Sequence, residues 1–236
     1  MESGKLFLKA LSLGTGLFLA FASPVALAGE SSKQIWLDYN PSWVISPKVT
    51  ISGDAGYRTE LESGGGSRLV LRPGVDLPSK FVTFKAGIGN FWTISDAITN
   101  RWEIRPYQGV AWVWPRSRVN VDHLVRLEER FDFNTVTWTS INSLRGRYRL
   151  RFRYLFDAVQ PGRFWRAFGS GEFFLKLAGE EGVQREQFRL TLGLERSFSP
   201  LRRFRLEVTW QQEEIFFLPS ESADAIYFRF RVYQNF

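Results

Sequence analysis

One stretch of the chain, residues 143–156, has an arginine at every second position. The five arginines are Arg145, Arg147, Arg149, Arg151 and Arg153, and the residues between them are apolar, aromatic or glycine. A helix would spread these arginines around its circumference, whereas a strand directs alternate side chains to opposite faces. The stretch is therefore predicted to be a strand with one cationic and one apolar face. Such strong alternation is typical of a transmembrane barrel, because lipid requires an apolar exterior while the lumen accepts charge.

Residues 1–28 have the features of a secretory signal peptide. Two lysines precede an apolar run over residues 10–22, and Ala28 ends a cleavage site of the A-x-A type. A retained membrane anchor is the alternative, but the run is short for a membrane span. We expect cleavage after Ala28, which leaves residues 29–236 as one exported domain. No later stretch approaches the roughly 20 consecutive apolar residues of a transmembrane helix.

The end of the chain carries a second targeting feature. From Ile226 onward apolar and polar residues alternate, and the last residue is phenylalanine. An amphipathic last strand that ends in phenylalanine resembles the signal by which outer-membrane barrels of Gram-negative bacteria reach their insertion machinery. We therefore expect an outer-membrane location, with the barrel-assembly machinery, outer-membrane lipid and lipopolysaccharide as partners. The residues assigned to the assembly signal are Phe228, Phe230, Val232 and Phe236.

The rest of the chain reads as a series of long strands. Eleven strands are predicted, at residues 34–45, 48–60, 68–77, 81–94, 101–115, 118–133, 142–157, 164–178, 186–199, 203–217 and 223–236. Short turns with Pro or Gly alternate with longer polar loops, as in outer-membrane barrels with periplasmic turns. The first half is less regular, because Asp38 and Asp54 interrupt its pattern. We predict an all-β, antiparallel up-and-down transmembrane barrel of about twelve strands, or ten, because bacterial single-chain barrels normally have an even number.

The polar face of these strands forms a lattice of charges, which is predicted to line the lumen. Its members are Arg126, Glu128, Arg130, Arg145, Arg147, Arg149, Arg151, Arg153, Glu172, Arg189, Arg205 and Glu207. Unpaired arginines in a narrow interior would be costly, so carboxylates are expected between them. We expect Arg126, Glu128 and Arg130 to face Arg147, Arg149 and Arg151 on the next strand. The lattice either fills and rigidifies a small barrel or selects anionic solutes or headgroups.

Several short motifs resemble the recurring blocks of a known bacterial barrel family. They occur, in order, at residues 105–108 (Arg-Pro-Tyr-Gln), 126–131 (Arg-Leu-Glu-Glu-Arg-Phe), 147–151 (Arg-Tyr-Arg-Leu-Arg), 171–174 (Gly-Glu-Phe-Phe) and 187–190 (Gln-Phe-Arg-Leu). The family is known as domain of unknown function 2490, and the resemblance covers most of the chain after the predicted signal peptide. The resemblance implies an outer-membrane barrel and no established activity.

Signatures of catalysis are weak in this chain. Outer-membrane phospholipases and lipid A deacylases use a His-Ser pair, but the one histidine, His123, has no serine in an H-x-S motif and falls on the predicted lipid face. One histidine and no cysteine argue against metal ligation, and no cofactor is expected. Five carboxylates could perform acid–base chemistry, although each is interpreted as an arginine partner: Glu103, Glu128, Glu172, Glu195 and Glu207.

The charge of the chain is the last constraint on its function. The formal net charge is +7, which in other chains can indicate nucleic acid binding. Nucleic acid is disfavoured here, because the arginines alternate with lipid-type residues and the chain is predicted to be exported. The leading prediction is a non-enzymatic, porin-like barrel, either a structural membrane component or a narrow path for an anionic solute. The alternative is an outer-membrane lipid-modifying enzyme that uses carboxylates.

Overall fold

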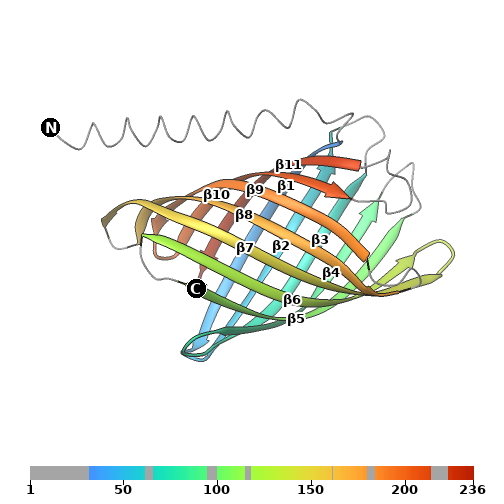
Figure 1. The fold of residues 1–236 in the computed structure, drawn as a ribbon, viewed down its shortest axis with the longest axis horizontal. Coiled ribbons are helices and arrows are strands. Elements are labelled where there is room, and N and C mark those ends of the chain that lie inside the picture. Colours follow the sequence, from blue (N-terminus) through green and yellow to red (C-terminus); the bar gives the residue numbers. More distant parts are fainter. Residues whose placement is uncertain are drawn as a thin grey trace. The chain divides into compact units, whose positions relative to one another are not determined.

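In the computed structural model, eleven strands of the described residues form one closed barrel (Figure 1). The structure describes residues 32–61, 66–94, 100–114, 118–160, 162–179, 184–213 and 223–236. The predicted signal peptide lies outside these ranges. Within them, no helix has the length and apolar character needed to cross a membrane.

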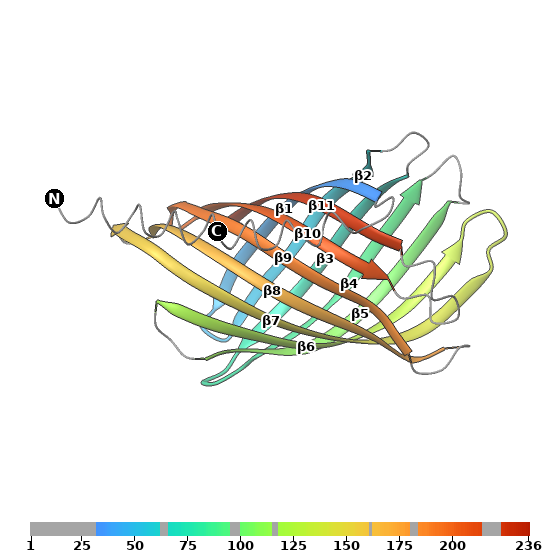
Figure 2. The same ribbon diagram turned by 45° about the horizontal axis from the view of Figure 1, so that its top comes forward.

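The strands are long, between 12 and 21 residues. They are β1 (Ser32–Ser46), β2 (Val49–Glu60), β3 (Ser67–Pro78), β4 (Thr83–Ile94), β5 (Arg101–Trp114), β6 (Val119–Asn134), β7 (Ser140–Gln160), β8 (Arg163–Ala178), β9 (Gln184–Ser199), β10 (Arg202–Glu213) and β11 (Ala223–Asn235). Figure 2 shows them inclined to the long axis of the barrel, as closure of a sheet requires. The bounds agree with the predicted strands to within a few residues, and the predicted extension of the tenth strand to residue 217 lies outside the described ranges.

The predicted all-β, mostly antiparallel barrel is confirmed, and the described residues form eleven strands rather than twelve or ten. Every pair of strands that follow one another in sequence is antiparallel. The barrel is closed by a parallel ladder between β1 and β11, which runs from Ser32 opposite Ala225 to Ser42 opposite Asn235. In an up-and-down series with an odd number of strands, the first and last strands point the same way. Only a parallel pair can then close the barrel.

The two ends of the barrel differ in their connections. Residues 47–48, 79–82 and 200–201 make short connections at one end, which we call the turn rim. Residues 135–139 belong to the opposite end, which we call the loop rim. Strand β1 begins at the loop rim and β11 ends at the turn rim, so the first and last described residues lie at opposite ends of the barrel.

The two surfaces of the barrel wall have opposite character. Each strand presents at least one large apolar side chain to the outside with 40–71% of its surface exposed: Leu37, Ile51, Leu71, Phe84, Trp114, Val125, Phe152, Phe173, Leu194, Leu206 and Phe230. The inner surface carries buried charged and polar groups. Asp38 and Asp54, which interrupted the sequence pattern, both belong to this inner set and pair with Arg229 and Arg72 respectively.

Candidate functional site

The structure places all twelve predicted lattice residues on the inner surface, on strands β6 to β10. Their side chains form ion pairs, hydrogen bonds and ring contacts inside the barrel. The four residues of the predicted assembly signal lie on the outer surface of β11, or just after it, with 40–55% of their surface exposed. The distribution of these residues between the two faces follows directly from alternation along each strand.

The predicted pairing of residues between β6 and β7 is wrong at two of its three positions. Arg126 does lie opposite Arg147, but Glu128 lies opposite Arg145 and Arg130 lies opposite Ser143. The two strands are antiparallel, so residue numbers fall on one strand as they rise on the other. As a result, the residue of β7 that lies opposite Glu128 is on the loop-rim side of Arg147.

Glu128 is the centre of the largest charge cluster in the described structure. Its carboxylate accepts hydrogen bonds from Arg145, at 2.6 Å from Nη2 and 3.0 Å from Nε. Arg105, Arg126 and Arg147 approach the same carboxylate to 3.5, 3.6 and 4.0 Å. The side chain is only 2% exposed. One buried carboxylate thus serves four arginines on β5, β6 and β7.

The other inner carboxylates are also engaged by arginines. Glu172 accepts from Arg147 at 2.8 Å, and Arg149 lies 4.0 Å away. Further pairs of 3.3 Å or less join Glu103 to Arg105 and Arg130, Glu195 to Arg166 and Arg205, and Glu207 to Arg205. The expectation that carboxylates would stand between the arginines is therefore met in the geometry. Each pair is stabilised by charge-assisted hydrogen bonding inside the barrel.

A continuous ring of contacts runs around the interior, and we call it the belt. Its members, in order, are Phe91, Arg58, Trp36, Tyr227, Arg189, Phe174, Arg145, Glu128 and Arg105. The guanidinium of Arg58 lies 3.9 Å from the ring centre of Trp36 and 5.9 Å from that of Phe91. Trp36 in turn stacks on Tyr227, with ring centres 4.4 Å apart. Cations over aromatic rings attract them electrostatically, so these contacts stabilise one another.

The other half of the belt closes the ring. Arg189 and Arg145 approach the ring centre of Phe174 to 4.7 and 4.9 Å. Arg105 lies 4.3 Å from the ring centre of Phe91, and it is joined to Arg145 through the shared carboxylate described above. The four aromatic rings are each 6% exposed or less. The belt therefore narrows the interior.

The aromatic members of the belt were not predicted. Each lies on the charged face of its strand: Trp36 is two residues from Asp38, Phe174 from Glu172 and Tyr227 from Arg229. Binary patterning treats an aromatic residue at such a position as an interruption. These residues could have been found by searching several strands for an aromatic residue two positions from a charged residue, because that spacing places both on the same face.

A chamber with a volume of about 430 Å³ extends from the belt toward the turn rim. Its lining runs from Trp36 and Arg58 of the belt to Ser42, Asp76 and Asn235 near the turns. Among the described residues that line it, twelve are Arg or Lys and four are Asp or Glu. The chamber is therefore strongly basic.

Several chamber arginines have little compensation from carboxylates. Arg58 and Arg151 form no ion pair within the described part of the chain, and the carboxylate nearest to Arg149 is 4.0 Å away. The buried Nε atoms of Arg126, Arg147, Arg149 and Arg151 have no hydrogen-bond acceptor among the described residues. Buried N–H groups normally have an acceptor, so these arginines retain capacity to bind an anion.

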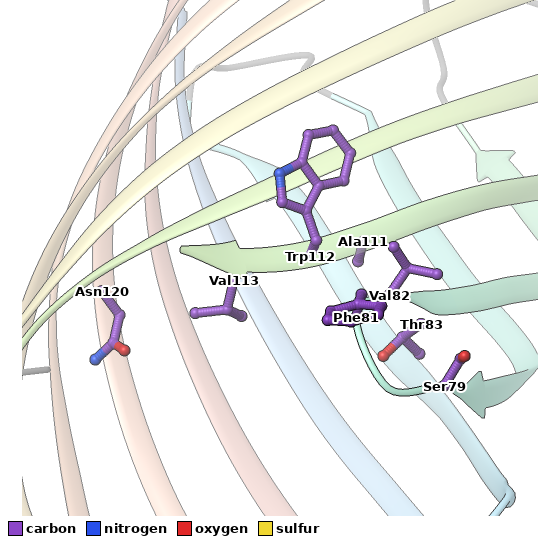
Figure 3. Close-up of a pocket in the computed structure, with 8 residues that line it drawn as sticks. All are labelled: Ser79, Phe81, Val82, Thr83, Ala111, Trp112, Val113 and Asn120. Atoms are coloured by element: carbon purple, nitrogen blue, oxygen red, sulfur yellow. The ribbon is translucent and has the colours of Figure 1, made fainter. Parts of the chain in front are cut away.

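A second cavity, of about 480 Å³, lies at the turn rim (Figure 3). It is formed by the β3–β4 connection, the end of β5 and the start of β6, and its lining is mainly apolar. Phe81, which lines it, is 74% exposed. Figure 3 shows Val113 and Trp112 on opposite sides of β5, as alternation requires. With no charged side chain in its lining, this cavity offers no anchor for a charged ligand or a metal.

The described part of the chain holds no metal-ligating cluster, and its histidine contacts aromatic side chains. Its residues contain no group of three or more His, Cys, Asp or Glu side chains that could hold a metal ion. The ring of His123 stacks on Trp112 at 4.7 Å, and its Nδ1 lies 2.9 Å from the hydroxyl of Tyr148. His123 therefore lies on the outer surface of the wall, as its position in the strand predicted.

Comparison with known proteins identifies a family. The sequence model of a family described as "Protein of unknown function (DUF2490)" matches residues 33–231, which run from β1 into β11. Neither a curated protein nor a solved structure matches the chain.

Proposed function

This chain belongs to the DUF2490 family of proteins of unknown function, as its motifs indicated, and from that premise we propose that it is an integral outer-membrane β-barrel whose basic interior forms a narrow pathway for small anions. The family carries no activity that could be transferred to the chain. The proposal therefore depends on the two surfaces of the barrel wall and on the ends of the sequence.

The outer surface supports a membrane location. A soluble monomer rarely exposes contiguous apolar patches larger than a few hundred Å², whereas here every strand presents large apolar side chains outward. No described element covers this surface. Lipid is the partner that fits an apolar surface enclosing a whole barrel, because a closed barrel also satisfies all backbone hydrogen bonds within its wall.

The two targeting features of the sequence support the outer membrane in particular. The predicted signal peptide would direct the chain to export. The terminal Phe236 lies on the outer surface at the turn rim, where its ring stacks on Trp43 with centres 5.1 Å apart. In outer-membrane barrels the short turns are periplasmic, so the basic chamber would open toward the periplasm and the belt would lie between it and the loop rim.

The charge of the chamber supports an anionic solute. Lining arginines outnumber lining carboxylates, and Arg58 and Arg151 have no carboxylate partner in the described structure. A ring of positive side chains favours anions in a pore. This excess of uncompensated arginine in the chamber is the single observation that carries the functional part of the proposal.

The enzymatic alternative has less support. A general acid or base needs a carboxylate that is free to exchange a proton with its substrate. The five carboxylates considered for that role each lie within 3.3 Å of an arginine nitrogen: Glu103, Glu128, Glu172, Glu195 and Glu207. Arginine pairing keeps a carboxylate ionised and occupied. We therefore favour a non-enzymatic barrel.

The proposal is tested by conductance of the purified protein in planar lipid bilayers. Under a salt gradient, the reversal potential should indicate preference for the anion. Arg151→Gln should reduce that preference, while Arg196→Gln, on the outer surface beside Trp165, should leave it unchanged. Fractionation of cells should recover the protein with outer membranes. Absence of conductance, or preference for cations, would refute the pathway, and recovery in the soluble fraction would refute the membrane location.

A further inference from the structure

We propose that the chamber contains a binding site for a polyvalent oxyanion of the phosphate class, with Arg149 and Arg151 as its main ligands. This inference deepens the proposed function, because it depends on the anionic preference of the interior. It does not depend on conduction, since binding within the chamber requires access from one rim only.

The position of the two arginines supports a shared ligand. They are two residues apart on one face of β7, which separates their Cα atoms by about 6.6 Å. Arg151 lies opposite Ser170 on β8, and Arg149 lies opposite Glu172. Glu172 is bonded to Arg147 at 2.8 Å and is 4.0 Å from Arg149. The carboxylate of Glu172 is thus bonded mainly to Arg147. The guanidinium groups of Arg149 and Arg151 can therefore bind one ligand together.

The donors of this cluster match a phosphate group. A guanidinium group offers planar, paired N–H donors that suit phosphate and carboxylate oxygens. The Nε atoms of Arg126, Arg147, Arg149 and Arg151 are buried and have no acceptor among the described residues. Ser170, which also lines the chamber, adds a hydroxyl on the strand beside Arg151. A tetrahedral oxyanion can accept from several such donors at once.

The excess of charge indicates that the ligand is polyvalent. Twelve basic and four acidic side chains line the chamber. Three further carboxylates outside the lining pair with lining arginines, namely Asp38, Glu128 and Glu195. Positive charges still exceed negative ones by five when these are included. One monovalent anion would neutralise little of this excess, whereas a diphosphate carries several charges in a volume that a chamber of about 430 Å³ accommodates.

The test uses the full barrel refolded in detergent micelles, with inorganic pyrophosphate titrated by calorimetry. Saturable binding is expected for the wild type. The double variant Arg149→Gln with Arg151→Gln should bind at least roughly tenfold more weakly, because two charge-assisted interactions are lost. The double variant Arg153→Gln with Asp122→Asn is the matched control. It removes an ion pair on the inner face without leaving Asp122, which lies opposite Arg151, as an unpaired carboxylate. It should bind within about twofold of the wild type.

Two further measurements keep the result interpretable. Altered gel migration on heating reports whether each variant is folded, and Arg149→Lys with Arg151→Lys keeps the charges and should bind between the wild type and the glutamine variant. Displacement of pyrophosphate by phosphatidic acid in the micelles would support the site and identify a lipid headgroup as the source. Binding without displacement would support a soluble phosphate. No saturable binding by the wild type, or equal weakening by Arg153→Gln with Asp122→Asn, would overturn the proposal and leave the conductance test standing.

Discussion

Replacing Glu128 by glutamine should destabilise the barrel strongly, because it removes one negative charge that four arginines share. The carboxylate is 2% exposed and accepts from Arg145 at 2.6 Å, with three more arginines between 3.5 and 4.0 Å. Removing one partner of a buried ion pair costs about 3–5 kcal/mol. Glutamine still offers one acceptor to Arg145, so we expect about 2–4 kcal/mol.

The adjacent residue provides a matched control for this experiment. Glu129 is exposed on the outer surface, opposite Leu144 of β7. Glu129→Gln makes the same chemical change one position along and should cost less than about 0.5 kcal/mol. Urea titration in lipid vesicles, followed by tryptophan fluorescence and by gel migration with and without heating, gives both free energies. If Glu128→Gln unfolds at the wild-type urea concentration, or if Glu129→Gln is the more damaging change, the assignment of a shared buried carboxylate is incorrect.

Three other perturbations test separate parts of the structure. Leu150→Arg puts a charge on the outer surface and should cost about 2–4 kcal/mol at the bilayer midplane. Arg149→Leu should cost less, because the nearest carboxylate, that of Glu172, is 4.0 Å from Arg149. Urea titration ranks the two variants, and the reverse order would mean that the two faces of β7 are inverted. Deleting Phe236 should lower the yield in outer-membrane fractions while export continues, and a normal yield would contradict its role in assembly. Phe174→Ala, in the belt, should raise conductance in bilayers, whereas Phe173→Ala, which is 47% exposed outside, should not; equal conductance of the two would show that the belt is not the constriction.

The strands and the two faces of the wall were readable from the sequence wherever charge and apolar residues alternate without interruption. Residues 145–153 are the clearest example. Arginine at every second position places all five arginines on one face only if the segment is a strand. The same alternation located β6, β9, β10 and β11 to within a few residues. Local pattern was sufficient in these strands because most of their outward residues are apolar and most of their inward residues are charged or polar.

The first four strands were harder to read, for a reason that the structure makes clear. Their inner surface carries buried apolar side chains such as Val70 and Phe91, so apolar residues occur on both faces. It also carries glycine: a Cβ at Gly74 or Gly87 would collide with the hydroxyl of Tyr107. A pattern that combines apolar, glycine and charged residues on one face has no simple period. The belt was missed for the same reason.

The pairing across the barrel was beyond the reach of local pattern. Alternation assigns a face to Glu128 but does not identify its partner, because the register of β6 against β7 depends on the connection between them. The parallel ladder of β1 and β11 joins residues that are far apart in sequence. The even strand number of most bacterial barrels suggested a twelfth strand, whereas the eleven strands in the sequence are enough to close the structure.

The parallel pairing of β1 and β11 also limits how this chain can be circularly permuted. In a barrel with an even number of strands, both ends lie at one rim, and a short linker can join them for circular permutation. Here Ser32 is at the loop rim and Phe236 at the turn rim. Because Asn235 lies opposite Ser42, a linker from Phe236 to Ser32 would have to span ten residues of β1, or about 33 Å along the strand. In the membrane location that we propose, it would run either through the chamber or along lipid with unsatisfied amides. The strand order of this barrel therefore cannot be permuted with a short connection.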